Sequence, residues 1–548
     1  MRLLPALVTL AVAAWPCLAA PRFEISFPKE MSATPLDGHV LLLLATNGTR
    51  EPRFQINFTY HSQQVFGVDV DGLAPGAAAV VDSSTLGYPS ESLKDIPAGD
   101  YWVQGLINIY ETFHLTNGHT VKLPPDKGEG QRWETKPGNL YSTPRKVHFD
   151  PGSDEVIRVS LTERIKDVPP EKPDTKWVKH VKIRSELLSR FWGKPVELGA
   201  VVLLPDGWAE HPDAHFPLIV LQDHFSRELP RILQMQSQPD RGPGYKFYQD
   251  WIAGRMPRVI IMTIQHANPY FDDSYAVNSA NAGPYGDAIT QELIPYVERQ
   301  FRGIGQGWAR AVYGGSTGGW EALASQVFYP DFYNGAYVFC PDVVDFRAYM
   351  TMNLYVDSNA FWIEGPFGRT PRPAMRYDGG LLYSTMEQMN RYELVLGTKG
   401  RSAEQLDAWQ AFFSSVGPDG YPQPIFNKRT GVIDHQVARY WKEHYDLTHI
   451  IERDWKTLGP KLAGKLHVCV GDADTFYLNR AVHLLQDFLV TTTNPYYRGS
   501  FDYGEDKPHC YTGNFDRQVG LNQHYLPLMT KHMEETAPPG ADVSSWKY

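Results

Sequence analysis

The sequence AVYGGSTGG occupies residues 311–319 and decides the fold. Its first residues are apolar, as in a buried strand, and they lead into the pattern G-x-S-x-G centred on Ser316. Residues 320–328 then favour a helix. A serine on a tight turn between a strand and a helix needs flanking glycines, because Cβ atoms there would collide with neighbouring backbone. The stretch therefore predicts a nucleophilic serine at the edge of an α/β sheet.

The segments around this stretch alternate between apolar strands and helices. Near-continuous apolar runs are typical of strands that are covered on both faces of a sheet. Residues 286–302 place apolar side chains at helical spacing, as in a helix that packs on such a sheet. The strands are predicted at residues 218–222, 259–264, 311–313, 336–339 and 466–470. We expect residues 179–548 to form one α/β domain.

A long segment interrupts this alternation. Residues 343–460 are rich in Tyr, Phe, Trp, Pro and Gly and precede the strand at 466–470. A connection of this length is seldom structureless, and its position after a sheet strand favours an insertion that caps the site. The alternative is a decoration remote from the chemistry.

The first third of the chain has a different character. Residues 1–19 combine a basic start, a short apolar run and small residues, which predicts a cleaved signal peptide and a secreted or periplasmic protein. Lipid attachment at Cys17 is the alternative. Residues 20–165 carry short β-type runs separated by turn residues and predict a β-sandwich-like accessory domain. Residues 166–178 contain three prolines and predict a stiff linker.

Composition limits the partners of the protein. The chain has 62 acidic and 52 basic side chains, a net charge of -10, so no basic surface for nucleic acid is predicted. No segment after the signal peptide offers the roughly 20 consecutive apolar residues of a membrane span. Loss of the signal peptide leaves Cys340, Cys469 and Cys510, which permit at most one disulfide. The pairing of Cys510 and the oligomeric state are left open.

A serine nucleophile requires a base and an acid that orients the base. In an α/β-hydrolase the three residues follow in the order Ser, Asp, His. Residues 471–476 read GDADTF and place two carboxylates after a sheet strand. Asp474 is preferred as the acid, because the longer loop lets its carboxylate turn back toward the histidine, whereas Asp472 is suited to cap the next helix. Asp342 is a third candidate.

The base is sought among the four histidines that follow the acid. His483 lies in a helical run, and His524 and His532 flank the C-terminal helical stretch. His509 lies in an irregular loop, where a mobile base is usually found. Ser316, Asp474 and His509 are therefore the predicted catalytic triad.

Two backbone N–H groups are expected to stabilise the oxyanion. Thr317 follows the nucleophile, and Phe225 follows the strand at 218–222. The N–H of His224 is the alternative to that of Phe225. Asp223 and His224 also resemble a metal-binding pair, but no further ligands follow at consistent spacing. No metal and no cofactor are predicted.

Five motifs occur in a characteristic order: FPLIVLQD at 216–223, GD at 286–287, ELIPYVE at 292–298, GGSTGG at 314–319 and GDAD at 471–474. In this order they resemble the putative esterase family, which includes esterase D, feruloyl and acetylxylan esterases and enterochelin esterases. The likeness covers roughly residues 179–528 without the insertion. It implies an α/β-hydrolase fold, ester hydrolysis without a cofactor, and the triad given above.

The sequence departs from the family pattern at three places. Thr317 stands where many members have methionine or leucine, and Asp223-His224 replaces the commoner histidine-glycine. The long insertion is also atypical. These departures concern the substrate rather than the type of reaction.

We therefore predict a serine carboxylic ester hydrolase that forms an acyl-enzyme on Ser316. Export and the aromatic-rich insertion favour small-molecule or polysaccharide-borne esters, such as acetyl or feruloyl side chains. A peptidase of the prolyl oligopeptidase type would need a propeller of roughly seven blades, for which residues 20–165 are too few and contain no repeat. An inactive, exported binding protein is the third hypothesis, and it gives no reason to retain a triad.

Overall fold

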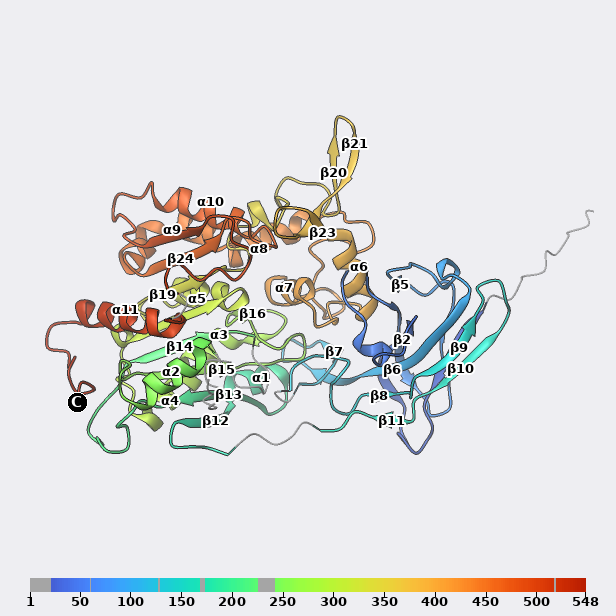
Figure 1. Ribbon diagram of the computed structural model, residues 1–548, viewed down its shortest axis with the longest axis horizontal. Coiled ribbons are helices and arrows are strands. Elements are labelled where there is room, and N and C mark those ends of the chain that lie inside the picture. The colour runs from blue at the N-terminus through green and yellow to red at the C-terminus, as the bar shows by residue number, and fades with distance from the viewer. Residues whose placement is uncertain (1–20, 60, 127–128, 168–172, 225–241, 517–518) are drawn as a thin grey trace, which may run out of the picture.

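The computed structural model describes residues 21–59, 61–126, 129–167, 173–224, 242–516 and 519–548. The predicted signal peptide, Phe225 and the middle of the predicted linker lie outside these ranges. The N-terminal β region lies to one side of the α/β region, and a hairpin projects from the part between them (Figure 1). Within the described ranges, no helix has both the length and the apolar content of a membrane span.

One eight-stranded sheet forms the centre of the α/β region, in the order β12-β13-β15-β14-β18-β19-β24-β25. β12 and β13 are antiparallel, β13 is antiparallel to β15, and all later neighbours are parallel. The strands are β12 (Val178–Ser185), β13 (Val196–Leu203), β14 (Leu218–Gln222), β15 (Ile260–Gln265), β18 (Arg310–Gly315), β19 (Ala336–Phe339), β24 (Leu466–Gly471) and β25 (Ser500–Gly504). This sheet confirms the predicted α/β-hydrolase fold.

Two hydrophobic cores cover the faces of this sheet. Leu218 and Val220 of β14 face the larger core, whereas Ile219 and Leu221 face the smaller one. A strand that lies between the two cores must therefore carry apolar residues at every position. The larger core is closed by α1 (Glu186–Trp192), α4 (Ile294–Phe301), α5 (Thr317–Phe328), α9 (Leu447–Leu462) and α10 (Asn479–Leu489), and the smaller one by α2 (Gly242–Ile252) and α11 (Leu521–Thr536).

The helix predicted at 286–302 is divided. It comprises α3 (Tyr285–Asp287), a π-helical turn at Ala288–Leu293, and α4. Pro295 is the second residue of α4 and closely follows the π-helical turn, where the regular pattern of helical hydrogen bonds is already interrupted.

The N-terminal region is a sandwich of two sheets, which confirms the predicted all-β domain. One sheet has the order β10-β1-β4, and the other has the order β11-β8-β6-β2-β3-β5, with β7 and β9 also paired to β6. Apolar side chains from both sheets, such as Ile25 and Leu42, share one core. The strands are β1 (Arg22–Ser26), β2 (Leu36–Ala45), β3 (Gln64–Leu73), β4 (Ala79–Val81), β5 (Gly87–Tyr88), β6 (Gly99–His114), β7 (Thr120–Leu123), β8 (Leu140–Tyr141), β9 (Arg145–Phe149), β10 (Val156–Ser160) and β11 (Glu163–Arg164).

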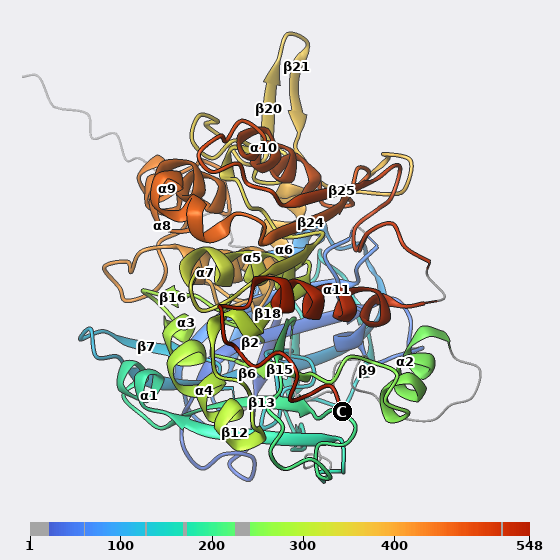
Figure 2. The same ribbon diagram turned by 90° about the vertical axis from the view of Figure 1, so that its left-hand side faces the viewer.

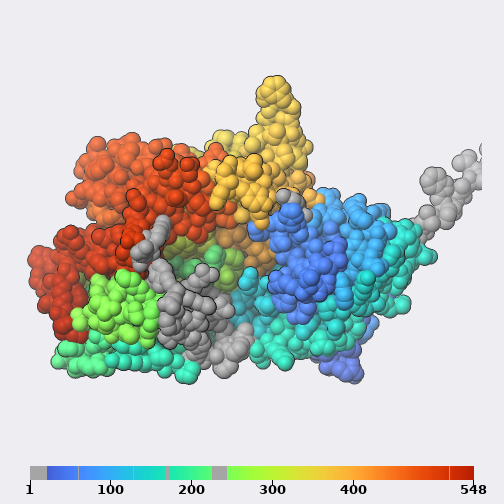
Figure 3. Space-filling model, viewed as in Figure 1, coloured from blue at the N-terminus to red at the C-terminus, as the bar shows by residue number. Residues whose placement is uncertain are grey.

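The predicted insertion forms two hairpins and several helices. The hairpin of β20 (Trp362–Gly365) and β21 (Gly368–Pro371) projects from the body in both ribbon views and in the space-filling view (Figures 1, 2 and 3). The second hairpin pairs β22 (Pro373–Arg376) with β23 (Leu382–Thr385). The helices α6 (Met386–Leu396), α7 (Gln405–Phe413) and α8 (His435–Tyr445) follow. α9 begins inside the predicted range but ends at Leu462, beyond residue 460; it packs against α5 and shares the larger core with the sheet.

The insertion lies against the N-terminal sandwich. α6 contacts β3 and β5, and in Figure 1 it lies between the sandwich and the sheet of the α/β region. His39 Nε2 lies 2.8 Å from the carbonyl oxygen of Val395, and Arg401 Nη2 lies 3.0 Å from Asp69 Oδ2. Apolar side chains of both regions share a further core. The three parts of the chain are therefore joined by direct contacts.

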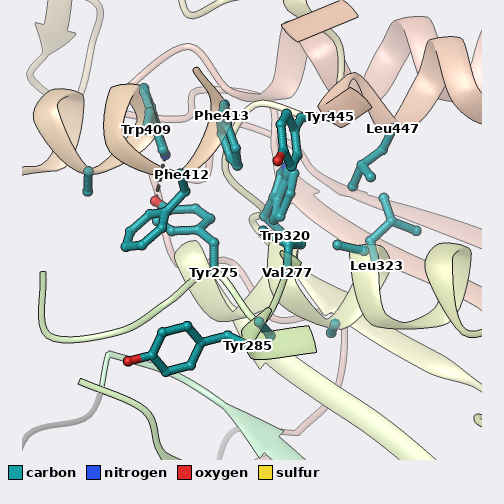
Figure 4. Packing of buried hydrophobic residues seen from close by; sticks show 14 of the residues in the cluster. Tyr275, Val277, Tyr285, Trp320, Leu323, Trp409, Phe412, Phe413, Tyr445 and Leu447 are labelled. Atoms are coloured by element: carbon teal, nitrogen blue, oxygen red, sulfur yellow. Dashed lines mark hydrogen bonds between the residues drawn. The ribbon is translucent and has the colours of Figure 1, made fainter. Parts of the chain in front are cut away.

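An aromatic cluster fixes the insertion to the helix that follows Ser316 (Figure 4). The rings of Trp320 in α5 and Phe413 in α7 have centroids 4.9 Å apart, and Phe413 stacks on Tyr445 of α8 at 5.1 Å. Trp409 Nε1 of α7 donates a hydrogen bond of 2.5 Å to the Tyr275 hydroxyl. α7 is thereby held directly over the start of α5.

Candidate active site

Ser316 lies on the turn between β18 and α5. Its backbone φ of 57° and ψ of -122° are costly for a residue with a side chain. The flanking glycines make this turn possible: a Cβ atom on Gly314 would collide with the carbonyl oxygen of Gly318, and one on Gly318 would collide with that of Gln222. The turn thus holds the serine hydroxyl beyond the carboxyl end of the sheet.

Three side chains meet at this edge of the sheet. His509 Nε2 lies 2.8 Å from Ser316 Oγ, and His509 Nδ1 lies 2.7 Å from Asp474 Oδ2. Asp474 is fully buried, and its Oδ1 accepts hydrogen bonds from the backbone N–H groups of Phe476 and Leu478, at 2.9 and 3.1 Å. The loops after β18, β24 and β25 therefore bring together the three residues that the sequence singled out.

The two other carboxylates considered from the sequence lie elsewhere. Asp472 is 45% exposed and lies 3.4 Å from His483. It does not cap α10, whose N-cap residue is Leu478. Asp342 is buried and accepts hydrogen bonds of 2.8 Å from Thr317 Oγ1 and the Tyr275 hydroxyl. Among the described contacts, only Asp474 supplies a carboxylate to the imidazole of the site.

The surroundings make this imidazole strongly basic. Burial would lower the pKa of His509, but hydrogen bonds to Asp474 and Cys510 outweigh it and raise the pKa to about 10. The ring of Phe476 meets the imidazole edge to face, with centroids 4.9 Å apart. The charged form of His509 is therefore favoured by its neighbours.

A polar network lies behind Ser316. Thr317 Oγ1 is 3.0 Å from His224 Nε2, and His224 Nδ1 is 2.9 Å from Asp273 Oδ2 and 3.3 Å from Asp272 Oδ1. Burial would lower the pKa of His224, but its hydrogen bonds to Asp272 and Asp273 raise it well above its ordinary value. The network links the turn after Ser316 to the loops after β14 and β15.

Asp272 and Asp273 are functional candidates that sequence reasoning missed. Their only signal was a pair of carboxylates a few residues after an apolar strand. With His224 they place three metal-binding atoms within 4.8 Å of one another, a donor set that a cation could use. In the structure the imidazole itself is the cationic partner of both carboxylates, through a hydrogen bond to Asp272 and an ion pair with Asp273.

Only one of the two predicted oxyanion donors can be located. Thr317 is fully buried in the first turn of α5, where N–H groups have no acceptor within the helix. Phe225 lies outside the described residues. His224, the alternative donor, directly precedes it and touches Thr317 through its side chain.

A cavity of about 160 Å³ opens onto Ser316. All three regions of the chain contribute to its wall: Phe58 comes from the sandwich, Tyr392 and Trp409 come from the insertion, and Leu478 follows β24. A second cleft, of about 820 Å³, shares four residues with this cavity: Phe58, Tyr392, Glu404 and Gln405. A third cavity, of about 390 Å³, borders β12 and β13 and contains none of the three triad residues. The first two are the candidate substrate site.

The sheet topology and the strained turn that carries Ser316 define an α/β-hydrolase fold. Within this class, residues 195–411 match the family model described as "Putative esterase", so the family resemblance is confirmed over that range. The matched range includes Ser316 and ends in α7. Over this range the chain is similar to the esterases of that family.

Similar solved structures include a ferulic acid esterase, with a TM-score of 0.37 and 15% identity over 65% of this chain and 99% of that one. An S-formylglutathione hydrolase from Agrobacterium tumefaciens has a TM-score of 0.34 and 11% identity over 66% and 97% of the two chains. A dipeptidyl peptidase 4 from Porphyromonas gingivalis has a TM-score of 0.36 and 12% identity over 86% and 53%. No curated protein matches the chain.

Proposed function

We propose that the protein is an exported serine esterase that hydrolyses carboxylic esters through an acyl-enzyme on Ser316. The line of hydrogen bonds from Ser316 through His509 to Asp474, at 2.8 and 2.7 Å, carries this proposal. A serine hydroxyl becomes a nucleophile when an imidazole accepts its proton, and a carboxylate on the other ring nitrogen fixes the tautomer that can do so.

The reaction follows from this geometry. Ser316 Oγ attacks the ester carbonyl carbon while His509 Nε2 accepts the hydroxyl proton. His509 returns this proton to the alkoxide oxygen, so the alcohol leaves and Ser316 remains acylated. A water molecule, deprotonated by His509, then attacks the acyl carbon; the bond to Ser316 Oγ breaks, His509 returns the proton to this oxygen, and the acid is released. Asp474 stabilises the imidazolium in both steps, and the N–H groups of Thr317 and Phe225 are the proposed oxyanion donors.

The cavity on Ser316 supports an uncharged acyl group. Met350, Met389 and Leu406 contribute apolar surface to it. Its three carboxylates are Asp342, Glu393 and Glu404. Asp342 accepts hydrogen bonds from Thr317 and Tyr275, and Glu393 is paired with Lys428 at 2.5 Å. Burial raises the pKa of Glu404 to about 8, so that Glu404 is mostly neutral at pH 7. An acetyl or aromatic acyl group fits this lining better than a charged one.

The larger cleft supports a bulky alcohol portion. Its walls include Phe54, Trp133 and Phe271, together with the charged Arg53 and Arg132. Aromatic rings and polar side chains in one groove are suited to sugar rings and their hydroxyls. A polysaccharide-borne ester is therefore our preferred substrate. The peptidase hypothesis loses support, because the described N-terminal strands form a sandwich where that hypothesis requires a propeller.

Labelling with a fluorophosphonate probe tests the nucleophile. Wild-type protein should bind the probe covalently at Ser316, and Ser316→Ala should not bind it, while both give the same circular dichroism spectrum. Folded wild type that stays unlabelled would favour the inactive binding protein. Assays with acetylated, feruloylated and siderophore esters would then identify the substrate class.

Export is tested separately. The full chain should be expressed in a host that has a secretion pathway. The exported protein should then begin at residue 20, as the predicted signal peptide 1–19 requires. An unprocessed protein that stays inside the cell would contradict export without affecting the esterase proposal.

A further inference from the structure

Two cysteines lie beside the histidine of the site. Cys340 follows β19 and is buried, and Cys510 follows His509 and is exposed; both are free thiols. Their sulfur atoms and a ring nitrogen of His509 all lie within 4.8 Å of one another. A disulfide has a sulfur–sulfur distance of about 2.05 Å, so the two sulfur atoms have to move closer together before the bond can form.

The two cysteines lie on different segments of the site. The backbone N–H of Cys340 donates a 2.6 Å hydrogen bond to Cys469 of β24, and the preceding Phe339 accepts one of 3.0 Å from the N–H of Ser316. Cys340 is thus fixed to the strands beside the nucleophile. Cys510, in contrast, lies on the loop that carries the base. A bond between the two sulfur atoms would tie the base loop to the nucleophile side.

The thiols differ in acidity in the way that disulfide exchange requires. Hydrogen bonds to Cys340 and His509 outweigh burial and lower the pKa of Cys510 to about 4. The hydrogen bond to Cys510, together with burial, raises the pKa of Cys340 well above its ordinary value. Cys510 is therefore the thiolate that attacks an oxidant, and Cys340 is the thiol that resolves the intermediate.

The thiolate also affects the base. The titratable groups that face His509 are Asp474, Cys510, Cys340 and, farther away, Asp342. A thiolate beside the ring helps to hold a proton on His509, and a protonated imidazole cannot accept the proton of Ser316. A sulfur atom in a disulfide carries no charge, so oxidation would remove this hindrance while Asp474 stays in place.

We propose that Cys340 and Cys510 form a reversible disulfide beside the triad, and that closing this bond activates ester hydrolysis. The activation rests on the function proposed above. The oxidant is a low-molecular-weight disulfide. Cys510 attacks one of its sulfur atoms and releases the first small thiol; Cys340 then loses its proton, attacks Cys510 Sγ and releases the second. Two protein thiols are oxidised, and one small disulfide is reduced to two thiols.

Mass spectrometry of the wild-type protein tests the bond without reference to catalysis. After incubation with glutathione disulfide, digestion should yield a cross-linked peptide that contains Cys340 and Cys510, and dithiothreitol should remove it. Failure to detect this peptide, or a cross-link to Cys469 in its place, would overturn the proposal.

Activity on a small acetate ester tests the switch. At pH 7 we expect kcat/KM to be higher in the oxidised protein, because loss of the thiolate lowers the pKa of His509 and so increases the fraction of neutral imidazole. The pH at which the reduced enzyme reaches half of its maximal rate should be correspondingly higher. Equal rates, or a lower rate after oxidation, would contradict activation.

Three serine variants separate the roles of the thiols. Cys340→Ser should stay at the low rate in both oxidising and reducing buffer, because it keeps the thiolate at 510 and cannot close the bond. The rate of ester hydrolysis by Cys510→Ser should be the same in oxidising and reducing buffer. Cys469→Ser, the matched control, should respond like wild type. If the cross-link forms but neither redox state hydrolyses esters, the esterase proposal fails and the disulfide site stands.

Discussion

The edge of the sheet, which carries Ser316, Asp474 and His509, and the wall of the cavity that opens onto Ser316 are built in different ways. At the edge, Ser316, Asp474 and His509 each lie just after a strand, and each position is fixed by its own short loop. The wall is assembled from distant parts of the chain. The ring of Phe58 in the sandwich lies 6.3 Å from that of Tyr392 in the insertion. If the protein is the proposed esterase, its reactivity depends on local backbone geometry, whereas its substrate choice depends on how three regions dock.

This difference predicts which changes will affect the reaction and which will affect only the substrate or the stability. Edge variants should lose turnover of every ester. Variants of the wall and of the docking contacts should keep the turnover of small esters. Four changes, in order of decreasing expected effect, test this division.

The largest effect is expected at the buried acid. Asp474→Asn should lower kcat by about 10⁴-fold for large and small esters alike, because an amide does not hold the proton on His509 Nδ1. The fold should be unchanged, since asparagine retains the oxygen that accepts from Phe476 and Leu478. Steady-state kinetics and thermal unfolding measure both. Asp472→Asn is the control, and a loss of that size in the control would show that the acid is wrongly assigned.

The next effect concerns the stability of the insertion. The Lys428 side chain is only 9% exposed and pairs with Glu393 at 2.5 Å and with Asp407. Lys428→Met leaves two buried carboxylates without a cation, so the free energy of unfolding should fall by about 3–5 kcal/mol. Urea denaturation measures this loss. Lys399→Met, which breaks an exposed pair with Asp419, should cost less than about 1 kcal/mol.

The Lys428→Met variant also tests the division itself. In conditions where it is still folded, its kcat for a small acetate ester should equal that of wild type. A fall in this kcat as large as that expected for Asp474→Asn would mean that the cavity wall and the sheet edge do not act independently.

A smaller and selective effect is expected at the sandwich side of the wall. Phe58→Ala should lower kcat/KM for a feruloyl ester by about 10–100-fold, because burial of an aromatic contact contributes roughly 1.5–3 kcal/mol. For a small acetate ester the change should be slight. Phe367→Ala, at the exposed tip of the projecting hairpin, is the matched control and should change neither. An equal loss on both esters in Phe58→Ala would argue against a role in substrate selection.

The smallest effect is expected at the docking contact of Asp69. Burial opposes ionisation, but His39 and Arg401 outweigh it and lower the pKa of Asp69 below its ordinary value of 3.8. A lowered folded-state pKa stabilises the fold above pH 3.8, and this stabilisation is lost as the pH falls below it. Asp69→Asn should therefore cost about 1 kcal/mol at pH 7, since the side chain is 38% exposed and screened.

Thermal unfolding between pH 3 and pH 7 measures this dependence. The difference between wild type and Asp69→Asn should shrink toward pH 3. A difference that stays constant over this range would show that the carboxylate charge does not matter for docking.

The edge was more predictable from the sequence than the wall. Ser316 is marked by its glycines, Asp474 by the strand before it and His509 by its irregular loop, so each signal is local. The buried parallel strands were predicted for the same reason, because their apolar runs are continuous. β12 was missed, since this edge strand mixes buried, partly buried and exposed residues and carries several charges. β13 and β25 were not predicted as sheet strands either.

Features that depend on strand order or domain docking could not be predicted. Asp272 meets His224 only because β14 and β15 are neighbours in the sheet. Phe58 reaches the cavity only because the sandwich docks on α6. Spacing along the chain contains neither relation, since both arise when separate segments bury apolar surface against each other.

The order of the sheet strands along the chain has a consequence for biosynthesis. His509 follows Ser316 by 193 residues, and β24 and β25, which precede the proposed acid and base, occupy the far edge of the sheet. A ribosome therefore makes the nucleophile well before its partners, and domains fold as units when their chains emerge. A nascent or half-translocated chain would meet cellular esters with an unactivated serine, and hydrolysis would begin only after translation has passed the last strand.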